Sequence, residues 1–203
     1  MNIFELLNAR RAVKNFDSNF VIPNEDIEKL LSAATLAPSA FNIQHWRFVI
    51  IKNRELRNQL RSAARDQPQV TDASLLIVLC ADLQAWTKDP AKYWENVPQA
   101  VRDFIVSAIH NYYADRPEVQ RDETMRSCGI VAQTIMLTAK EMGYDSCPMD
   151  GFDFAQVAKI INLPNDHIIS MMIAIGKSNK EPFPRATRLP LGNIIINDQF
   201  ITA

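Results

Sequence analysis

Glycine is scarce in this chain of 203 residues, which has five: Gly129, Gly143, Gly151, Gly176 and Gly192. No two of them are spaced to form the Gly-x-Gly-x-x-Gly turn of a dinucleotide-binding βαβ unit. The run Gly176-Lys177-Ser178 matches the end of a P-loop, but Met171 stands where that motif requires its first glycine. Any phosphate bound here must therefore be held by side chains, chiefly those of arginine and lysine.

The chain also has few cysteines, little net charge and no long apolar run. The three cysteines include no Cys-x-x-Cys pair, so the sequence contains neither a disulfide framework nor a zinc signature. Such cysteine usage is typical of a protein in a reducing compartment. A net charge of −1 argues against a general nucleic-acid binder. No apolar run approaches the roughly 20 residues of a membrane span, and the first residues lack the layout of a signal peptide. We therefore expect a cytoplasmic protein with no nucleic-acid or membrane partner.

Familiar catalytic constellations are absent too. His45, His110 and His167 share no metal-ligand spacing with one another or with the cysteines, so no metal site is expected. Ser39 lacks the glycine-flanked setting of a hydrolase nucleophile. As a lone signal, Ser39 is more typical of a turn or helix-cap residue.

Hydrophobic periodicity predicts alternating helices and buried strands. Helices are expected over residues 2–9, 23–37, 55–64, 97–113, 122–142 and 154–161, and strands over 48–51, 75–80 and 168–175. The unbroken apolar run 75–80 predicts a strand buried on both faces. The tail from residue 182 is expected to be irregular and then extended through 194–196. No linker divides the chain, so we expect one domain of the α/β or α+β class around a single sheet.

Two predicted helices have an expected inner face. In 97–113 it is Val101, Phe104, Ile105, Ala108 and Ile109, and in 122–142 it is Ile130, Val131, Thr134, Leu137 and Thr138. Gly143 is expected to end the longer helix. Residues 82–122 leave a long interval between the second strand and that helix, which argues against a simple doubly wound sheet.

Basic residues gather after the first helix. If the helix continues, Arg10 and Lys14 share a face and Arg11 lies about 100° away. This cluster is suited to clamping a phosphate. Basic residues at the end of a short helix also offset its dipole, and spacing alone favours that interpretation over a binding site.

Four segments, taken together, closely resemble the FMN-binding nitroreductase family over nearly the whole chain. They are Arg10–Phe16 (RRAVKNF), Ala37–Phe48 (APSAFNIQHWRF), Cys147–Phe152 (CPMDGF) and Pro184–Leu191 (PRATRLPL). The resemblance implies an α+β fold with a central, mainly antiparallel or mixed sheet flanked by helices. It also implies a single FMN-binding domain over residues 1–203 and an intertwined homodimer with FMN at the subunit interface.

The resemblance implies a role for each basic residue. Arg10 and Arg11 would reach the phosphate and ribityl chain of FMN, and Arg188, or else Arg185, would complete the phosphate site. Lys14 would lie beside the pyrimidine edge of the flavin ring. A cation at that edge stabilises the negative charge of the reduced ring and so tunes its reduction potential.

Further segments would surround the ring. Gln67 or Gln69 would bind its edge, and the backbone N–H near Asp150 would meet N5, the atom that accepts hydride. Pro38, Ser39 and Asn42 would come from the partner subunit. The full expected cofactor-binding set is Arg10, Arg11, Ala12, Lys14, Pro38, Ser39, Asn42, Gln67, Gln69, Pro148, Met149, Asp150, Gly151, Arg185 and Arg188.

Three positions depart from common family patterns. Asp150 stands where some members have Glu, which matters little if the backbone N–H makes the contact. Asp66 stands where relatives often have a neutral group, so we expect its carboxylate to point away from the flavin. Ala186 offers no charge where some relatives have lysine, which leaves the phosphate to Arg185 or Arg188.

The expected activity is ping-pong electron transfer from NADH or NADPH, through FMN, to nitroaromatics, quinones or similar small acceptors. A specialised flavin enzyme on the same scaffold, such as a reductive dehalogenase, and a low-turnover flavin-binding redox protein are the alternatives. The aromatic-rich stretch 82–122 is an excursion that either covers the flavin as a substrate lid or packs against the core or the partner. Both interpretations remain open.

Overall fold

Four strands form one antiparallel sheet in the order β1-β2-β4-β3. In the computed structural model, which describes residues 1–200, they are β1 (Trp46–Ile50), β2 (Leu75–Asp82), β3 (Asp145–Met149) and β4 (His167–Gly176). The expected α+β class with a central antiparallel sheet is confirmed. The last three residues of the expected domain lie outside the described range.

The strand β2 is the centre of the sheet because its sequence, LLIVLCAD, is apolar on both faces. All eight of its residues are buried. Leu76, Val78 and Cys80 face one hydrophobic cluster, and Leu75 and Ile77 face another. The prediction of a strand buried on both faces is confirmed.

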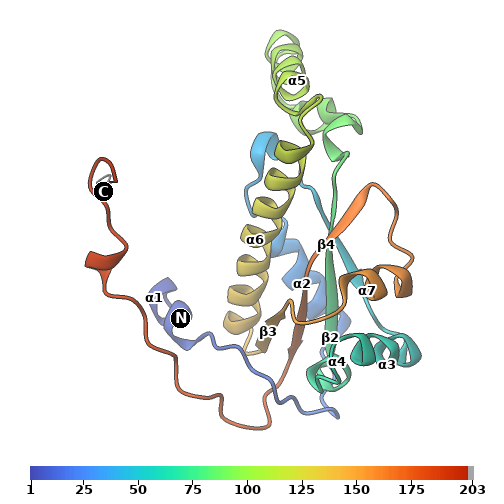
Figure 1. Ribbon diagram of the computed structural model, residues 1–203, viewed down its shortest axis with the longest axis vertical. Coiled ribbons are helices and arrows are strands. Elements are labelled where there is room, and N and C mark those ends of the chain that lie inside the picture. The colour runs from blue at the N-terminus through green and yellow to red at the C-terminus, as the bar shows by residue number, and fades with distance from the viewer. Residues whose placement is uncertain (201–203) are drawn as a thin grey trace.

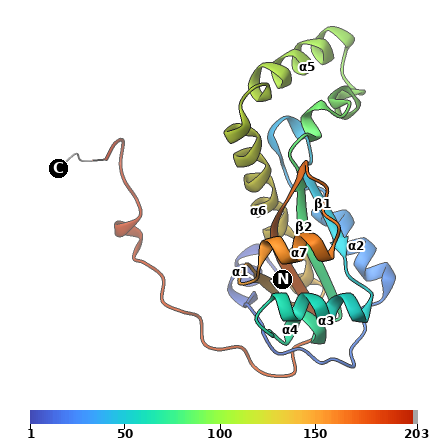
Figure 2. The ribbon, with the colours of Figure 1, turned by 45° about the vertical axis from the view of Figure 1, so that its right-hand side comes forward.

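Helices cover the two faces of this sheet (Figures 1 and 2). On one face lie α3 (Arg54–Ala63), the short α4 (Gln69–Asp72) and α7 (Phe154–Ile160). On the other lie α2 (Asn24–Ala34) and the long α6 (Pro117–Glu141). Among residues 1–200, no helix combines the length and apolar character that crossing a bilayer requires.

The inner faces of the two longest helices differ from those predicted. In α6 the residues on the sheet are small or polar as well as apolar, among them Ser127, Cys128 and Ala132, whereas Ile130 is 38% exposed. In α5 (Gln99–Tyr113), Phe104 is 73% exposed, and only Ile109 and Tyr113 are buried. The prediction for α5 is confirmed for Ile109 and wrong for Val101 and Phe104, which are exposed because this helix projects beyond the sheet (Figure 1).

The stretch after β2 forms the predicted excursion. It contains two 3₁₀ turns, η2 (Ala85–Thr87) and η3 (Pro90–Trp94), and the helix α5. A small cluster of its own, with Ile43, Ala85, Ile109 and Tyr113 fully buried, joins it to the end of the sheet.

Both ends of the chain lie on one side of the body. The helix α1 (Ile3–Ala9) lies beside the end of α6, where the N-terminal ammonium is 3.0 Å from Glu141 Oε1. From about residue 180 the chain runs away from the sheet and forms one turn, η4 (Leu191–Asn193) (Figures 1 and 2). Residues 194–196, expected to be extended, follow this turn and join no strand of the sheet.

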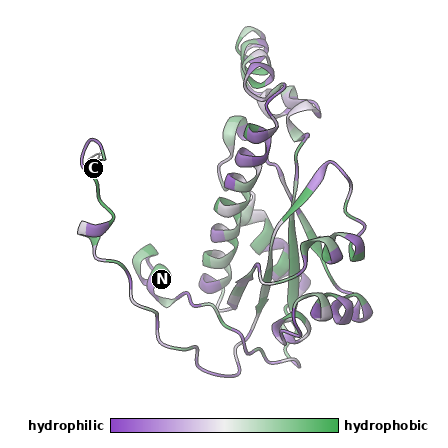
Figure 3. Ribbon diagram, viewed as in Figure 1, coloured by the Kyte–Doolittle hydropathy of each residue, from purple (hydrophilic) through white to green (hydrophobic). Residues whose placement is uncertain are grey.

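Apolar side chains are exposed along these terminal segments. In α1, Phe4 is 79% exposed, and in the C-terminal segment Phe183, Leu191 and Phe200 are 70–85% exposed. Figure 3 shows hydrophobic colour along the strands and again in α1 and towards the end of the C-terminal segment. Such a surface is typical of an interface with another protein chain.

Candidate functional site

The segment after α1 is extended, not helical. The helix ends at Ala9, and Arg10 has φ −64° and ψ 128°. Val13 then donates its N–H to Ser146 O (3.0 Å), which aligns the segment with β3. The prediction that Arg10 and Lys14 share a helix face was therefore wrong. Lys14 is exposed beside the buried Val13 because the segment forms a short bridge to an edge strand.

The side chain of Arg185, in the C-terminal segment, caps the C-terminal end of α1. Its Nη2 lies 3.1 Å from Leu7 O, 2.9 Å from Asn8 O and 2.7 Å from Arg10 O. A cation is favourable here because the last carbonyls of a helix carry partial negative charge. This contact folds the segment after residue 180 back onto the basic cluster.

Two basic segments, one with Arg10 and Arg11 and one with Arg185 and Arg188, contact each other here. Arg185 donates to Arg10 O, and Arg11 donates from Nη2 to Phe183 O. Burial and then the charges of Arg185, Arg188 and Arg11 lower the pKa of Arg10. Within residues 1–200, none of these four arginines forms a salt bridge with a carboxylate. Positive charges that repel one another and have no salt-bridge partner favour the binding of an anion.

A cavity of about 580 Å³ lies next to this cluster. Its lining includes Lys14, Gln67 and Gln69, together with the neighbouring Lys180 and Glu181 of the C-terminal segment. Gln69, which is 1% exposed, donates from Nε2 to Gln67 Oε1 (3.0 Å). Gln67 in turn donates from Nε2 to Gly151 O (3.1 Å). The structure thus brings together the expected glutamine pair, Lys14 and the loop after β3.

The loop after β3 lies between two cavities. Pro148, on an edge strand as proline requires, also lines a second cavity of about 310 Å³ with Asp150, Met125 and Ser170. Neither Asp150 nor Gly151 donates its backbone N–H to another group within residues 1–200. Two donors at this edge are therefore available to a ligand.

Sequence reasoning missed Met125 and Ser170. Leu79 pairs with Met171 and Cys80 with Ile169, so Ser170 is the extra residue of a β-bulge. Bulges often redirect side chains beside active sites. A serine inside the apolar run 168–175 was the available signal, whereas nothing local identifies Met125.

The segment Pro38–Asn42 lies elsewhere in the same chain. Phe41 packs against the same small cluster as Val119, near the start of α6, whereas the N-terminus before α1 contacts Glu141 at the end of α6. These two positions of α6 are about 33 Å apart at 1.5 Å per residue. A single chain does not place Pro38, Ser39 and Asn42 beside the basic cluster, so their supply by a partner subunit stays a prediction.

Two further side chains near the site are Asp66 and Cys147. Asp66 is exposed and is not among the residues that line the 580 Å³ cavity. Burial raises the pKa of the Cys147 thiol, with the nearby Lys14 acting in the opposite direction. This agrees with a structural role for Cys147.

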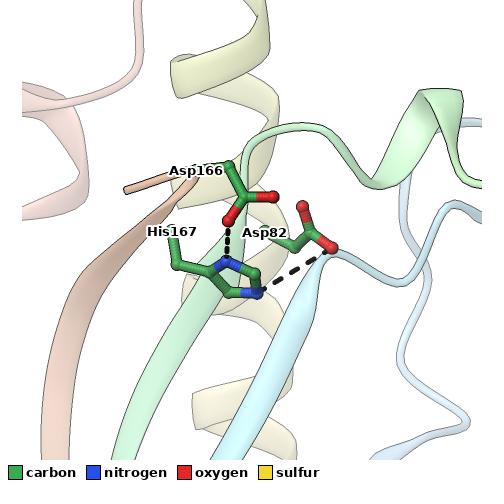
Figure 4. Close-up of side chains that lie close together, drawn as sticks. All are labelled: Asp82, Asp166 and His167. Carbon is green, nitrogen blue, oxygen red and sulfur yellow. Dashed lines mark hydrogen bonds and ion pairs between the residues drawn. The ribbon is translucent and has the colours of Figure 1, made fainter. Parts of the chain in front are cut away.

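A second polar group consists of Asp82, Asp166 and His167 (Figure 4). Sequence spacing did not indicate it, because these residues become neighbours only when β2 and β4 pair in the sheet. Their ligand atoms lie within 4.8 Å of one another. However, Lys88 Nζ lies 2.8 Å from both Asp82 Oδ2 and Asp166 Oδ2, and Arg47 Nη2 is 2.9 Å from Asp82 Oδ2. The hydrogen bonds from Lys88 and His167 lower the pKa of Asp166 to about 2. The group is an ion-pair network that fixes the base of the excursion.

Comparisons with known proteins agree with the geometry. The family model described as "Nitroreductase family" matches residues 7–177. The chain is 47% identical over 200 residues to Protein DrgA of Synechocystis, covering 96% of this chain and 95% of that protein. It is 30% identical over 184 residues to the oxygen-insensitive NADPH nitroreductase of Helicobacter acinonychis, covering 87% and 88%.

A solved structure gives the same result for the fold. A candidate nitroreductase of Exiguobacterium sibiricum, in complex with FMN, superposes with a TM-score of 0.88. It is 32% identical, and the match covers 97% of each chain.

Proposed function

Because the chain belongs to the nitroreductase family, we propose that it binds FMN and transfers electrons from NADH or NADPH to nitroaromatics, quinones or similar small acceptors. The observation that carries this proposal is the group of four arginines, which form no salt bridge within residues 1–200, beside a cavity of about 580 Å³. A phosphate supplies the missing negative charge, and the cavity offers room for a ring system.

The residues present fit FMN. Arg185 Nη2 is already hydrogen-bonded to three carbonyls at the end of α1, whereas Arg11 uses its Nη2 for one bond, to Phe183 O. Arg188 is exposed, and within residues 1–200 its side chain bonds only to Ala186 O (3.2 Å). We therefore assign the phosphate to Arg10, Arg11 and Arg188, and treat Arg185 as the residue that holds the tail in place.

The pyrimidine edge of the flavin would lie towards Lys14 and Gln67. When bound, FMN supplies a ring that accepts hydride at N5 and returns electrons to a second substrate. Lys14 places a compact positive charge at the cavity without an acidic partner among residues 1–200. The free backbone N–H groups of Asp150 and Gly151 are suited to orienting N5, since they add no titrating group.

The functional unit is a homodimer. The apolar side chains of α1 and of the C-terminal segment are exposed in one chain, and Pro38–Asn42 lies at the far end of α6 from the basic cluster. A second copy would cover the first surface and bring its own Pro38–Asn42 to the flavin. This supports the assembly that the sequence resemblance implies.

The kinetic order we propose is ping-pong, because one cavity system would serve both substrates. The nicotinamide dinucleotide binds, gives its hydride and leaves before the acceptor enters. The mixed apolar and polar lining near Met125 and Ser170 suits flat, uncharged acceptors. Reductive dehalogenation and a low-turnover redox role remain the alternatives.

Flavin reconstitution followed by steady-state kinetics tests this function. The purified protein should take up one FMN per chain and oxidise NADH or NADPH with menadione or a nitroaromatic as acceptor. Ping-pong kinetics predict parallel double-reciprocal lines when both substrates are varied. A protein that takes up no FMN would refute the proposal, and tight FMN binding without turnover would favour the low-turnover alternative.

A further inference from the structure

The segment between α2 and β1 holds three bulky or polar residues in a conformation that usually requires glycine. Phe41, Asn42 and Gln44 have φ values of 52°, 55° and 53°. Asparagine tolerates this left-handed region, but phenylalanine rarely adopts it. Such residues cost about 1–3 kcal/mol each and persist only where surrounding contacts hold them. The loop must therefore be held by its surroundings.

Contacts from the excursion hold the backbone and side chain of Phe41. Trp94, at the end of η3, donates from Nε1 to Phe41 O (3.3 Å). The Phe41 ring packs against Tyr112 and Tyr113 of α5, with centroid distances of 5.7 and 6.3 Å. Residues about 50 and 70 positions further along the chain thus support this one residue.

Internal hydrogen bonds close the loop around the residue expected to face the flavin. Ser39 O accepts from Asn42 N (2.9 Å), and Ser39 Oγ accepts from Gln44 N (3.0 Å). Ser39 Oγ uses one of its two lone pairs in this bond, and its O–H has no acceptor within residues 1–200, so it can donate to a ligand. The conformation of the loop therefore sets the direction in which Ser39 and Asn42 present their polar groups.

We propose that Trp94 and Phe41 are positioning residues for the flavin site, acting through Ser39 and Asn42 of the same loop. The excursion serves as a brace that keeps this loop in its left-handed conformation before the cofactor binds. The inference rests on the proposed function, in which this loop lines the flavin of the partner subunit. A preformed loop strengthens binding because less conformational entropy is lost when the ligand is bound.

Trp94→Phe and Trp86→Phe are a matched pair for testing the brace. Both substitutions remove an indole N–H from the excursion and keep an aromatic ring. Trp94 Nε1 bonds to Phe41 O, whereas the buried Trp86 Nε1 has no partner among residues 1–200. Trp86 stacks on Tyr113 (5.8 Å, 13°), so its replacement controls for lost aromatic packing.

The first measurement is hydrogen–deuterium exchange of residues 39–44 in the full-length protein without FMN. In Trp94→Phe, the amides of Asn42, Ile43 and Gln44 should exchange about fivefold faster than in the wild type, the factor expected from one neutral hydrogen bond. Trp86→Phe should leave their exchange at the wild-type rate. This readout needs no cofactor, so it tests the brace even if the protein binds no FMN.

The second measurement is the affinity for FMN. Trp94→Phe should raise the Kd about fivefold, because FMN binding must then order the loop, and Trp86→Phe should leave it unchanged. Equal exchange rates in the two variants would overturn the brace. A change only in the KM for the acceptor, with exchange and FMN affinity unaltered, would also overturn it and identify the excursion as a substrate lid.

Phe41→Leu supplies an independent variant. Leucine keeps the side chain apolar but loses the ring contacts with Tyr112 and Tyr113. It should reproduce the faster exchange of residues 42–44 and the weaker FMN binding of Trp94→Phe. Wild-type behaviour of Phe41→Leu in both measurements would contradict the role of Phe41.

Discussion

At the scale of single residues, two arginines of the C-terminal segment have different tasks. Arg188→Ala should raise the Kd for FMN about tenfold or more, because one charged hydrogen bond to the phosphate is lost. Arg185→Ala should lower the free energy of unfolding by about 1–3 kcal/mol, because three carbonyls at the end of α1 lose their donor. Titration with FMN and chemical denaturation of both variants separate the roles. If Arg185→Ala lost more FMN affinity than Arg188→Ala, then Arg185 would be the residue that binds the phosphate.

Lys14 offers a second test at this scale. Lys14→Ala should slow flavin reduction by NADH or NADPH more than it weakens FMN binding, because the arginines still hold the phosphate while the cation at the ring is gone. Stopped-flow reduction and FMN titration measure the two effects, with Lys180→Ala as a control that removes another cation lining the same cavity. Equal losses of rate and affinity in Lys14→Ala would make Lys14 another anchor for the cofactor.

His45 should make stability depend on pH. Its side chain is fully buried, and burial lowers its pKa to about 4, although the charges of Glu123 and Asp82 oppose the shift. Between pH 6.5 and 4 the unfolded chain binds this proton and the folded chain does not, so stability falls as the pH falls through this window. The loss should reach about 3 kcal/mol near pH 4. His45→Gln should flatten the urea-denaturation profile over this range, and an unchanged slope would contradict the prediction.

At the scale of elements, the ion-pair network at the base of the excursion joins β2 to β4. Lys88→Met should loosen residues 85–94, because Asp82, which is 1% exposed, and Asp166 lose the ammonium that bridges them. We expect faster hydrogen exchange in these residues and a Tm lower by several degrees, which corresponds to a loss of about 1–2 kcal/mol in the free energy of unfolding.

Because Lys88 already supplies the cation, EDTA should leave the wild-type Tm unchanged. A drop in Tm with EDTA would instead identify a metal site.

Elements defined by local patterns were predicted well. The strands β2 and β4 are long apolar runs, and α6 has a sustained helical period, so a single window of sequence identifies them. The strand β3 was missed because its residues, Asp-Ser-Cys-Pro-Met, have little strand character and pair only because β4 lies beside them. The inner face of α5 was mispredicted for the same reason, since its burial depends on where the helix lies in the molecule.

The candidate site was located by its segments but not by its geometry. The segments that resemble the family led us to expect Arg10, Lys14 and Gly151 at the site. The prediction that Arg10 and Lys14 share one face of a helix was wrong. The helix α1 ends at Ala9, where Arg185, more than 170 residues away, binds its last carbonyls. Met125 and Ser170 were missed because helix packing and a bulge, which single-sequence patterns do not report, bring them to the cavity.

At the scale of the whole molecule, the isolated chain leaves a large apolar surface uncovered. Leu191 is 70% exposed and Ile195 is 55% exposed in a segment that extends from the body (Figure 2). Burying such side chains contributes about 25 cal/mol per Å², which makes association with a second copy favourable. The protein should therefore sediment as a dimer of 23.1 kDa chains.

Leu191→Asp tests that assembly and its link to cofactor binding. A buried carboxylate in the interface is costly unless it is paired, so the variant should shift the dimer towards monomer at micromolar concentration. It should also weaken FMN binding, because Pro38–Asn42 would no longer reach the arginines of the other chain. Analytical ultracentrifugation with and without FMN measures both effects. Glu28→Asp, a conservative change at an exposed position of α2 away from the cavity, should leave them as in the wild type. A monomeric Leu191→Asp that binds FMN with wild-type affinity would show that one chain forms the whole site.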